Sequence, residues 1–430
     1  MGPLPKLRVS LAAGLIASIA TIGLSATRST ANTTPGSFDT ACNRGRGILL
    51  QADGRRATTY GPAAGLKSGV VLVALSTSKS SFLVEAISPD CTLDTHFGHE
   101  GILDLALPGK NDVSSIDVMV PLRSGNVLLV GSVTAKMIAA EVTPLGRLVR
   151  TFGHSGWLVH ALPGWSPGLD WGPSIDSVVQ ASSGDILVAS DNGSSHVSTQ
   201  GDVYEFTPGG GLDGSFGRGG WRRVLPIGAY IDQLIAEPNG SIVVYGQGVF
   251  GGCGGPEFEV LKANGQRDWS VNSNLARTES TVRHAGLKNG VVYLDHQGGM
   301  GLVGFGFGLK GCYSSGQFGY TEQLTPKGRV ANGTHRTYFK SGSFDIQFGV
   351  SISGNRFVSA GENWDQTVLG IREFQQNGAP VSAFGRGGIR DIRLGSWIYA
   401  SGPLVFAGPN GDVDVIVDSP RGARLLEVTT

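Results

Sequence analysis

The chain has 430 residues, and its 34 basic and 34 acidic side chains give a formal net charge of zero. A neutral chain without a clustered basic face lacks the electrostatic footprint of a protein that binds nucleic acid or an anionic membrane, so we exclude both partners. Charged residues make up 16% of the chain, whereas its 67 glycines are about twice the usual share. This composition favours many short strands joined by tight turns.

Residues 1–31 are predicted to be a signal peptide. Lys6 and Arg8 precede an apolar stretch of small residues from Val9 to Leu24, and the following Ser25-Ala26 or Ser29-Thr30-Ala31 is suited to cleavage. An uncleaved anchor is the alternative, but polar residues interrupt the stretch and it is short for a membrane span. Residues 32–430 are therefore expected to be secreted and to lie free of the membrane.

A polar residue and a glycine precede an apolar strand seven times along the chain. The glycines are spaced by 56, 59, 56, 50, 64 and 57 residues, an average of 57, which is typical of a repeat architecture. Glycine suits this position because a tight hairpin turn needs a positive φ. The seven glycines are Gly69, Gly125, Gly184, Gly240, Gly290, Gly354 and Gly411.

A second signature follows in each repeat, where a turn residue precedes a Phe-Gly pair by six positions. It is complete at Phe97, Phe152, Phe216 and Phe384, and another glycine follows each phenylalanine by four positions. The two remaining internal repeats keep the turn glycines Gly265 and Gly328 but place Val271 and Thr334 in the phenylalanine position. We expect these two repeats to be less regular than the others.

Four runs of strand length fit into each repeat, and in the second repeat the last of them is expected at residues 148–152. Four antiparallel strands repeated radially predict an all-β, seven-bladed β-propeller as a single domain over residues 32–430. The last repeat lacks its turn and Phe-Gly segment, and residues 36–42 have the missing spacing. Residues 37–51 are therefore expected to complete the seventh blade beside residues 412–429, which removes an exposed sheet edge.

The turn followed by Leu93-Asp94-Thr95, Phe97-Gly98 and Gly101, and then by a glycine-led apolar strand, resembles the delta-60 repeat of secreted and surface bacterial proteins. The resemblance covers residues 36–430. It implies a propeller-like fold but no shared reaction and no catalytic residues.

Four cysteines form an even set in a chain bound for an oxidising compartment, so two disulfides are expected. Sequence alone permits three pairings. The repeat alignment places Cys253 and Cys312 in corresponding loops of adjacent blades, which favours their pairing. Cys42 and Cys91 also belong to neighbouring blades and form the second predicted pair, although their positions in the repeat are offset by six residues.

Two surfaces are candidates for binding. The second position after the phenylalanine carries a basic or imidazole side chain in six repeats, which predicts a cationic girdle for carboxylate or phosphate groups. Its members are Arg44, His99, His154, Arg218, Arg336 and Arg386. The alternative is that each of these side chains caps a local carbonyl or pairs with a nearby acid.

The loop after the glycine-led strand is long or aromatic in four consecutive repeats, which favours sugar or peptide recognition. Its candidate ligand-binding residues are Asp191, His196, Phe250, Tyr313, Glu362, Trp364 and Asp365. No nucleophile elbow, phosphate loop or metal motif is present, so no cofactor and no metal are expected.

Two functions remain open. The main hypothesis is a monomeric, non-catalytic module that binds an extracellular protein or a glycan. The alternative is a hydrolase or lyase acting on a glycan, lactone or peptide at the channel mouth, with Asp191, His196, Glu362 and Asp365 as its reactive groups. An enzyme requires these groups to converge with perturbed pKa values, whereas a binding module does not.

Overall fold

A computed structural model describes residues 48–49, 51–52, 55–56, 59–76, 81–106, 114–133, 136–163, 174–192, 200–248, 256–271, 287–294, 300–307, 317–324, 339–340, 344–352, 356–363, 368–375, 379–386, 388–393, 404–407, 413–417 and 424–428. The predicted signal peptide lies outside this range. All the elements in the described residues are strands, and none of these residues forms a helix long and apolar enough to cross a membrane.

The strands form repeated four-stranded antiparallel units that follow one another along the chain. The first two units are β4 (Thr59–Gly65), β5 (Val71–Ser76), β6 (Ser81–Ile87) and β7 (Ile102–Ala106), then β8 (Ser114–Pro121), β9 (Val127–Val133), β10 (Lys136–Val142) and β11 (Trp157–His160). The next two are β12 (Ser174–Gln180), β13 (Ile186–Asn192), β14 (Gln200–Phe206) and β15 (Trp221–Val224), then β16 (Ala229–Ala236), β17 (Ile242–Gly248), β18 (Pro256–Leu261) and β19 (Arg267–Val271). A single parallel pairing of Gln200 with Ala229 joins these two into one larger sheet.

The remaining units repeat the same order. They are β20 (Leu287–Leu294), β21 (Met300–Phe307), β22 (Gln317–Leu324) and β23 (Phe339–Lys340), then β24 (Phe344–Ile352), β25 (Arg356–Asn363), β26 (Val368–Gln375) and β27 (Ile389–Arg393), and finally β28 (Leu404–Ala407), β29 (Val413–Val417), β30 (Arg424–Val428) and β1 (Ile48–Leu49). Each unit is named below by its first and last strand, and the last one is the β28–β1 sheet.

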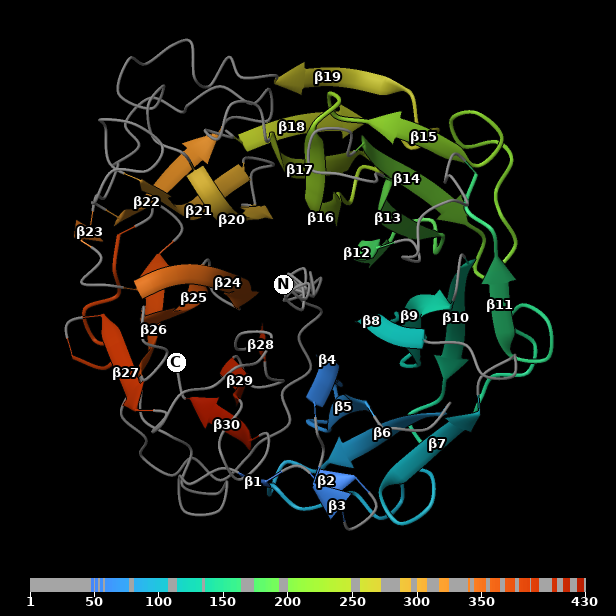
Figure 1. Cartoon of the computed structure of the whole chain (residues 1–430), viewed down its shortest axis with the longest axis horizontal. Coiled ribbons are helices and arrows are strands. Elements are labelled where there is room, and N and C mark those ends of the chain that lie inside the picture. Colours follow the sequence, from blue (N-terminus) through green and yellow to red (C-terminus); the bar gives the residue numbers. More distant parts are fainter. Residues whose placement is uncertain are drawn as a thin grey trace, which may run out of the picture.

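The sheets lie radially around a common centre, with the first strand of each sheet innermost (Figure 1). Each first strand contacts the first strand of the next sheet, and β28 contacts β4. This arrangement of repeated antiparallel sheets is consistent with a β-propeller.

The N-terminal strand β1 pairs with the C-terminal strand β30, through Ile48 with Leu425 and Leu49 with Arg424. The expected pairing of N-terminal residues with the last strands is therefore observed for Ile48 and Leu49, whereas residues 37–47 and residue 50 lie outside the described residues. Gln51 instead belongs to β2 (Gln51–Ala52), which pairs with β3 (Arg55–Arg56). The Asp53-Gly54 dipeptide between these two strands is typical of a tight turn, which favours the pairing of β2 with β3.

In the four sheets with a complete Phe-Gly segment, the fourth strand follows that segment instead of preceding it, so the prediction for residues 148–152 was wrong. In the β16–β19 sheet, where Val271 holds the phenylalanine position, the fourth strand β19 runs up to that position. Only Leu148 forms an isolated bridge, with Val142, and the Phe152 N–H donates to the Val149 carbonyl in a turn. The fourth strand is β11, which pairs with β10. Hydrophobic content made residues 148–152 look like a strand because the phenylalanine of a buried turn is as apolar as a strand residue.

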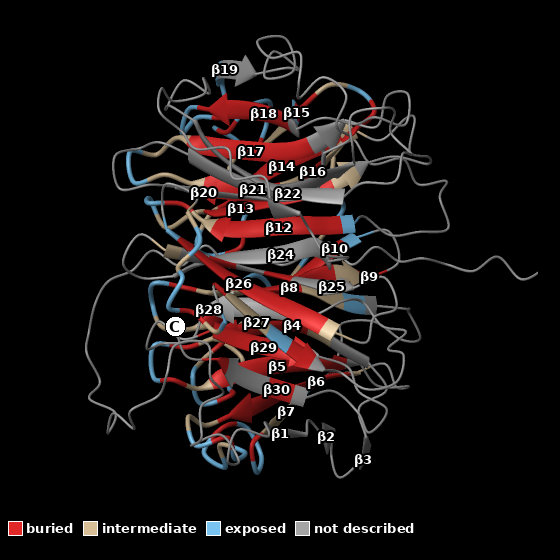
Figure 2. Cartoon of the chain, turned by 90° about the vertical axis from the view of Figure 1, so that its left-hand side faces the viewer, coloured by how far each residue is buried: buried red, intermediate tan, exposed pale blue. Residues whose placement is uncertain are grey.

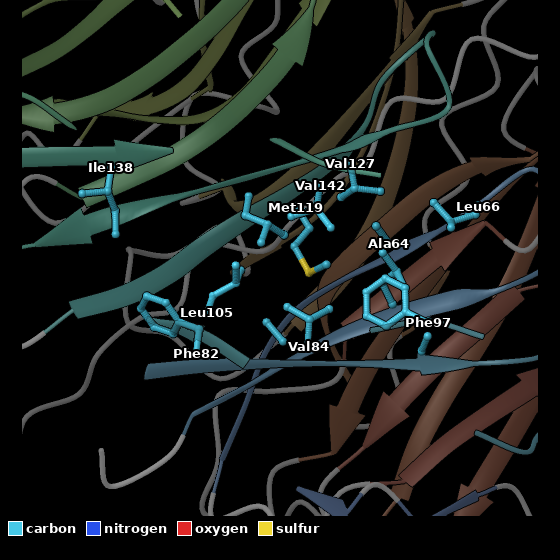
Figure 3. Close-up of a cluster of buried hydrophobic side chains, with 14 of the residues drawn as sticks. Ala64, Leu66, Phe82, Val84, Phe97, Leu105, Met119, Val127, Ile138 and Val142 are labelled. Carbon is cyan, nitrogen blue, oxygen red and sulfur yellow. The ribbon is translucent and has the colours of Figure 1, made fainter. Parts of the chain in front are cut away.

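The phenylalanine of this signature enters the core between its own sheet and the next. Phe97 belongs to the cluster that joins the β4–β7 and β8–β11 sheets, as Figure 3 shows with Met119 and Val84 nearby. Phe152 and Phe216 occupy the same place at the next two junctions, and Phe384 lies between the β24–β27 and β28–β1 sheets. These side chains are fully or almost fully buried.

The glycine after each phenylalanine connects neighbouring sheets by a hydrogen bond. The N–H of Gly98 donates to the Leu145 carbonyl at 3.0 Å, that of Gly153 to Gly209 at 2.9 Å, and that of Gly217 to Asn264 at 2.9 Å. Each acceptor directly precedes the turn glycine of the next sheet, which is Gly146, Gly210 or Gly265. We call this arrangement the Phe-Gly latch: the phenylalanine and glycine of one sheet against the turn glycine of the next.

The two ends of the strands differ in what they carry. At one end, the hairpin end, the first strand turns into the second and the third approaches the fourth through the Phe-Gly segment. At the other, the loop end, β5, β9, β13, β17 and β25 finish and the first strands begin. The edge-on view of Figure 2 shows buried strands between these two ends, with exposed residues in the described turns.

Candidate functional site

The predicted ligand-binding residues that the structure describes lie at the loop end. Asp191 is near the end of β13, and Glu362 holds the corresponding place near the end of β25. The two strands belong to sheets that are not neighbours, with the β16–β19 and β20–β23 sheets between them in chain order. His196, Phe250, Tyr313, Trp364 and Asp365 lie outside the described residues, so the expected convergence of four reactive groups stays a prediction.

Asp191 lies within a group of aspartates that the repeat alignment did not single out. Asp117 in β8, Asp176 in β12 and Asp232 in β16 each occupy a β-bulge near the loop end of an innermost strand. Asp202 lies near the start of β14, also at the loop end. We call these five residues the acid cluster: Asp117, Asp176, Asp191, Asp202 and Asp232.

Hydrogen bonds hold the centre of the acid cluster in place. An oxygen of Asp176 accepts the Asp191 backbone N–H at 2.8 Å, and its other oxygen accepts the Ser174 hydroxyl at 2.7 Å. Asp191 in turn accepts the backbone N–H of Ile231, in the next sheet, at 3.0 Å.

Burial shifts these carboxyls towards their protonated forms. Burial is the largest cause that raises the pKa of Asp191 to about 8. The Ile231 N–H opposes this shift, and the nearby charges of Asp232 and Asp202 contribute to it. Burial, followed by the charge of Asp191, raises the pKa of Asp176 well above its usual range. Two close carboxyls in a poorly solvated site cannot both ionise readily, so the pair exchanges a proton near neutral pH.

Some aspartates of the acid cluster recur at equivalent positions of consecutive sheets, as expected for a structural role, whereas Asp191 does not. Asp117, Asp176 and Asp232 each lie eight residues before a turn glycine, at equivalent bulges of consecutive sheets. Asp191 is less widely repeated, because Ser132 and Gln247 stand at the same distance after the turn glycines of the two neighbouring sheets, whereas Glu362 near the end of β25 is a second acid at this strand position. The Ile-Asp pair at this fixed spacing was a signal in the sequence, and it was missed because acids were sought in the loops.

Asp202 is buried and is paired at the outer side of the cluster. The Arg223 Nε lies 3.2 Å from Asp202, and the Arg223 guanidinium lies over the Trp221 ring at 5.6 Å from its centroid. The Tyr204 hydroxyl donates to the Pro163 carbonyl at 2.8 Å. Burial, with the charge of Asp202 as a second cause, raises the pKa of Tyr204, so this phenol stays protonated.

The cationic girdle was predicted from a position that lies at the hairpin end, opposite to the acid cluster. His99, His154, Arg218 and Arg386 are exposed, and each backbone N–H donates to the first residue of the following fourth strand. These four therefore occupy one equivalent place. Arg44 and Arg336 lie outside the described residues, and anion binding by the girdle stays a prediction.

The structure describes few of the residues that bear on the metal and disulfide predictions. Within the described part of the chain, no His, Cys, Asp and Glu side chains group as ligands for a metal ion. Cys91 is disulfide-bonded. The other three cysteines, Cys42, Cys253 and Cys312, lie outside the described residues, so both predicted pairings remain open.

No protein-family model and no curated protein matches the chain. Among solved structures, a protein of unknown function from Dyadobacter fermentans DSM 18053 is 12% identical, with a TM-score of 0.44 over 90% of this chain and 99% of its own. An arabinobiose-bound α-L-arabinanase from Penicillium chrysogenum is 13% identical, with a TM-score of 0.45 over 72% of this chain and 91% of its own.

A PL25 ulvan lyase is also similar, with 11% identity and a TM-score of 0.48 over 89% of this chain and 96% of its own. At these scores and identities, the similarities assign neither a family nor an activity to this chain.

Proposed function

We propose that the protein is an exported, seven-bladed β-propeller enzyme, a hydrolase or lyase whose acid–base group is the Asp176–Asp191 pair. The observation that carries this proposal is the position of the pair. It lies at the loop end of β12 and β13, where burial raises the pKa of Asp191 to about 8. Enzymes often tune buried carboxyls towards neutral pKa values so that they can act as general acids or bases.

The proposed fold has seven blades that form a closed ring. Contacts from each innermost strand to the next, including β28 with β4, support a closed ring. The β1–β30 pairing supports an N-terminal strand that completes the last blade. The Phe-Gly segments support membership of the delta-60 repeat proteins, and the apolar segment before the repeat region supports export.

The chemistry follows from having one protonated and one ionised carboxyl. The protonated member donates to a departing oxygen or nitrogen, and the ionised member removes a proton from water or from an acidic carbon. A glycan is the favoured substrate, because the loops that follow β17, β21 and β25 carry aromatic residues suited to stacking on sugar rings. Lactones and peptides are the alternatives within the same chemistry.

A non-catalytic binding module is the second candidate. It is favoured by the repetition of Asp117, Asp176 and Asp232, because an acid repeated at equivalent bulges fits a structural role. In that case the loop end binds an extracellular protein or glycan, and the acid cluster only shapes the strands beneath it.

Turnover by the purified protein separates the two candidates. The wild-type chain is assayed on aryl glycosides, uronic-acid polysaccharides, an aryl lactone and a peptide library, each over a range of pH. We expect turnover of at least one glycan, and Asp191→Asn is expected to reduce kcat at least about 100-fold, which is typical of a lost general acid or base.

Asp104→Asn is the matched control. Asp104 is an exposed acid on the outer strand β7, so this substitution should leave kcat unchanged. No turnover on the whole panel, combined with glycan-array binding that survives Asp191→Asn, would replace the enzyme by the binding module. Equal losses of kcat in both variants would also contradict the role of the pair.

Ring closure has a test of its own. Deletion of residues 36–50 removes β1 and leaves β30 with an exposed edge, so the thermal unfolding temperature of the mature chain should fall. Unfolding at an unchanged temperature would contradict closure by the N-terminal strand.

A further inference from the structure

The structure reveals how positions six residues apart in the repeat come together at the junction between two sheets. A Cβ placed on the turn glycine Gly146 would lie 3.1 Å from the Phe97 ring of the preceding sheet. The corresponding distance is 3.3 Å from Gly210 to Phe152 and 3.0 Å from Gly265 to Phe216. The turn position of one sheet therefore packs directly on the phenylalanine position of the sheet before it.

Cys91 occupies this turn position in the β4–β7 sheet. Its N–H donates to the Ser88 carbonyl at 2.8 Å, as the Gly146 N–H donates to Thr143 at 2.9 Å. Its φ is 60°, close to the 69° of Gly146, although residues other than glycine rarely adopt a positive φ. Cys91 is also disulfide-bonded.

The register of β1 identifies the residue at the matching phenylalanine position. The β29–β30 hairpin has the same register as the β5–β6 hairpin, because Val413 pairs with Val428 as Val71 pairs with Ile87. Leu425 and Val84, each three residues before the end of that pairing, therefore occupy equivalent positions in their sheets. Ile48 pairs with Leu425 as Leu103 pairs with Val84. Six residues before Leu103 stands Phe97, and six residues before Ile48 stands Cys42.

We propose that Cys42 and Cys91 form the disulfide, and that it replaces the Phe-Gly latch where the two ends of the chain meet. Among the described residues, the core of this junction joins Ile416 and Leu425 to the β4–β7 sheet without a phenylalanine in the place of Phe97. A covalent bond there holds the N-terminal strand against the turn of the first sheet. Its formation transfers two electrons and two protons from the thiols to a disulfide oxidant of the export compartment by exchange.

Peptide mapping of the full secreted chain under non-reducing conditions tests the pairing. We expect a cross-linked peptide that joins Cys42 to Cys91, and its disappearance after reduction. A peptide that joins Cys91 to Cys253 or to Cys312 would overturn the proposal. The result does not depend on enzymatic activity, so it separates this proposal from the proposed function.

A rescue experiment tests the equivalence with the latch. In a Cys253→Ser/Cys312→Ser background, Cys42→Ser/Cys91→Gly should lower the unfolding temperature by about 3–5 °C and abolish its response to reductant. Cys42→Phe/Asn43→Gly/Cys91→Gly rebuilds the latch that Phe97, Gly98 and Gly146 form. It should recover most of the lost temperature while remaining insensitive to reductant. A rebuilt latch that unfolds no later than Cys42→Ser/Cys91→Gly would overturn the equivalence.

Discussion

The hairpin end and the loop end of the strands differ in which features recur from sheet to sheet. The hairpin end repeats the same latch at successive junctions, with Phe97, Phe152 and Phe216 buried and a glycine hydrogen bond beside each. The loop end repeats an aspartate at three bulges but adds Asp191, an acid that the two neighbouring sheets lack at that position. In a repeat protein, a feature at every equivalent junction serves packing, whereas a feature that neighbouring repeats lack is free to serve a ligand. The difference directs functional experiments to the loop end and stability experiments to the hairpin end.

The largest effect is expected from breaking the hairpin end at Gly98. Its φ is +56°, and a Cβ there would lie 2.2 Å from the Ile102 carbonyl oxygen, so Gly98→Ala forces the backbone to move. We expect Gly98→Ala to reduce the free energy of unfolding by roughly 3 kcal/mol, since backbone strain and a clash add. Urea unfolding measures this change.

Gly125→Ala is the control for Gly98→Ala. Gly125 also has a positive φ, of +89°, but a Cβ there meets no atom within 4 Å. Its replacement should cost only about 1 kcal/mol, from backbone strain alone. Equal losses in the two variants would mean that the close approach inside the latch is unimportant.

An effect confined to pH dependence, and smaller over any single pH unit, is expected at the loop end from Asp117. Burial raises the pKa of Asp117 to about 7, whereas hydrogen bonds from Ser115 and Ser132 oppose the shift. The folded state therefore binds this proton more tightly than the unfolded chain, whose carboxyl has its ordinary value of 3.8. Stability is greatest below the lower value and falls as the pH rises towards 7.

Asp117→Asn should flatten this part of the stability profile. Each pH unit between the two values changes the free energy of unfolding by at most about 1.4 kcal/mol for one carboxyl. The amide cannot ionise, so the variant should lose less stability between pH 4 and pH 7. Unfolding temperatures measured across this range check the slope, and Gly98→Ala should leave that slope unchanged. A slope that is the same in Asp117→Asn and the wild type would show that this aspartate does not remain protonated.

Much of the hairpin end could be predicted from the sequence, because glycine and phenylalanine recur there at fixed spacing. The fourth strand was misplaced because Phe152 and its neighbours are as apolar as a strand, although Gly153 has a positive φ that ends regular structure. The acid cluster was missed for a different reason. Asp176 and Asp191 are 15 positions apart, and only the pairing of β12 with β13 brings them together. The contact between Asp176 and Asp191 depends on the register of β12 against β13, which no local sequence pattern predicts.

The smallest expected change in stability concerns Ser155, an exposed turn residue at the hairpin end. Ser155 follows Phe152 by three positions and has a φ of 55°, whereas the equivalent residue in the next sheet is Gly219 with a φ of 67°. Ser155→Gly removes the strain of a side chain in the left-handed region, although glycine also adds freedom to the unfolded chain. The net gain should be about 0.5–1 kcal/mol. Ser182→Gly is the matched control, because Ser182 is an exposed turn residue that is absent from the positive-φ residues of the described chain. That substitution should lower stability slightly through the unfolded chain alone. If urea unfolding gives both variants the same sign, the turn after the phenylalanine is not strained, and the preference for glycine there has another origin.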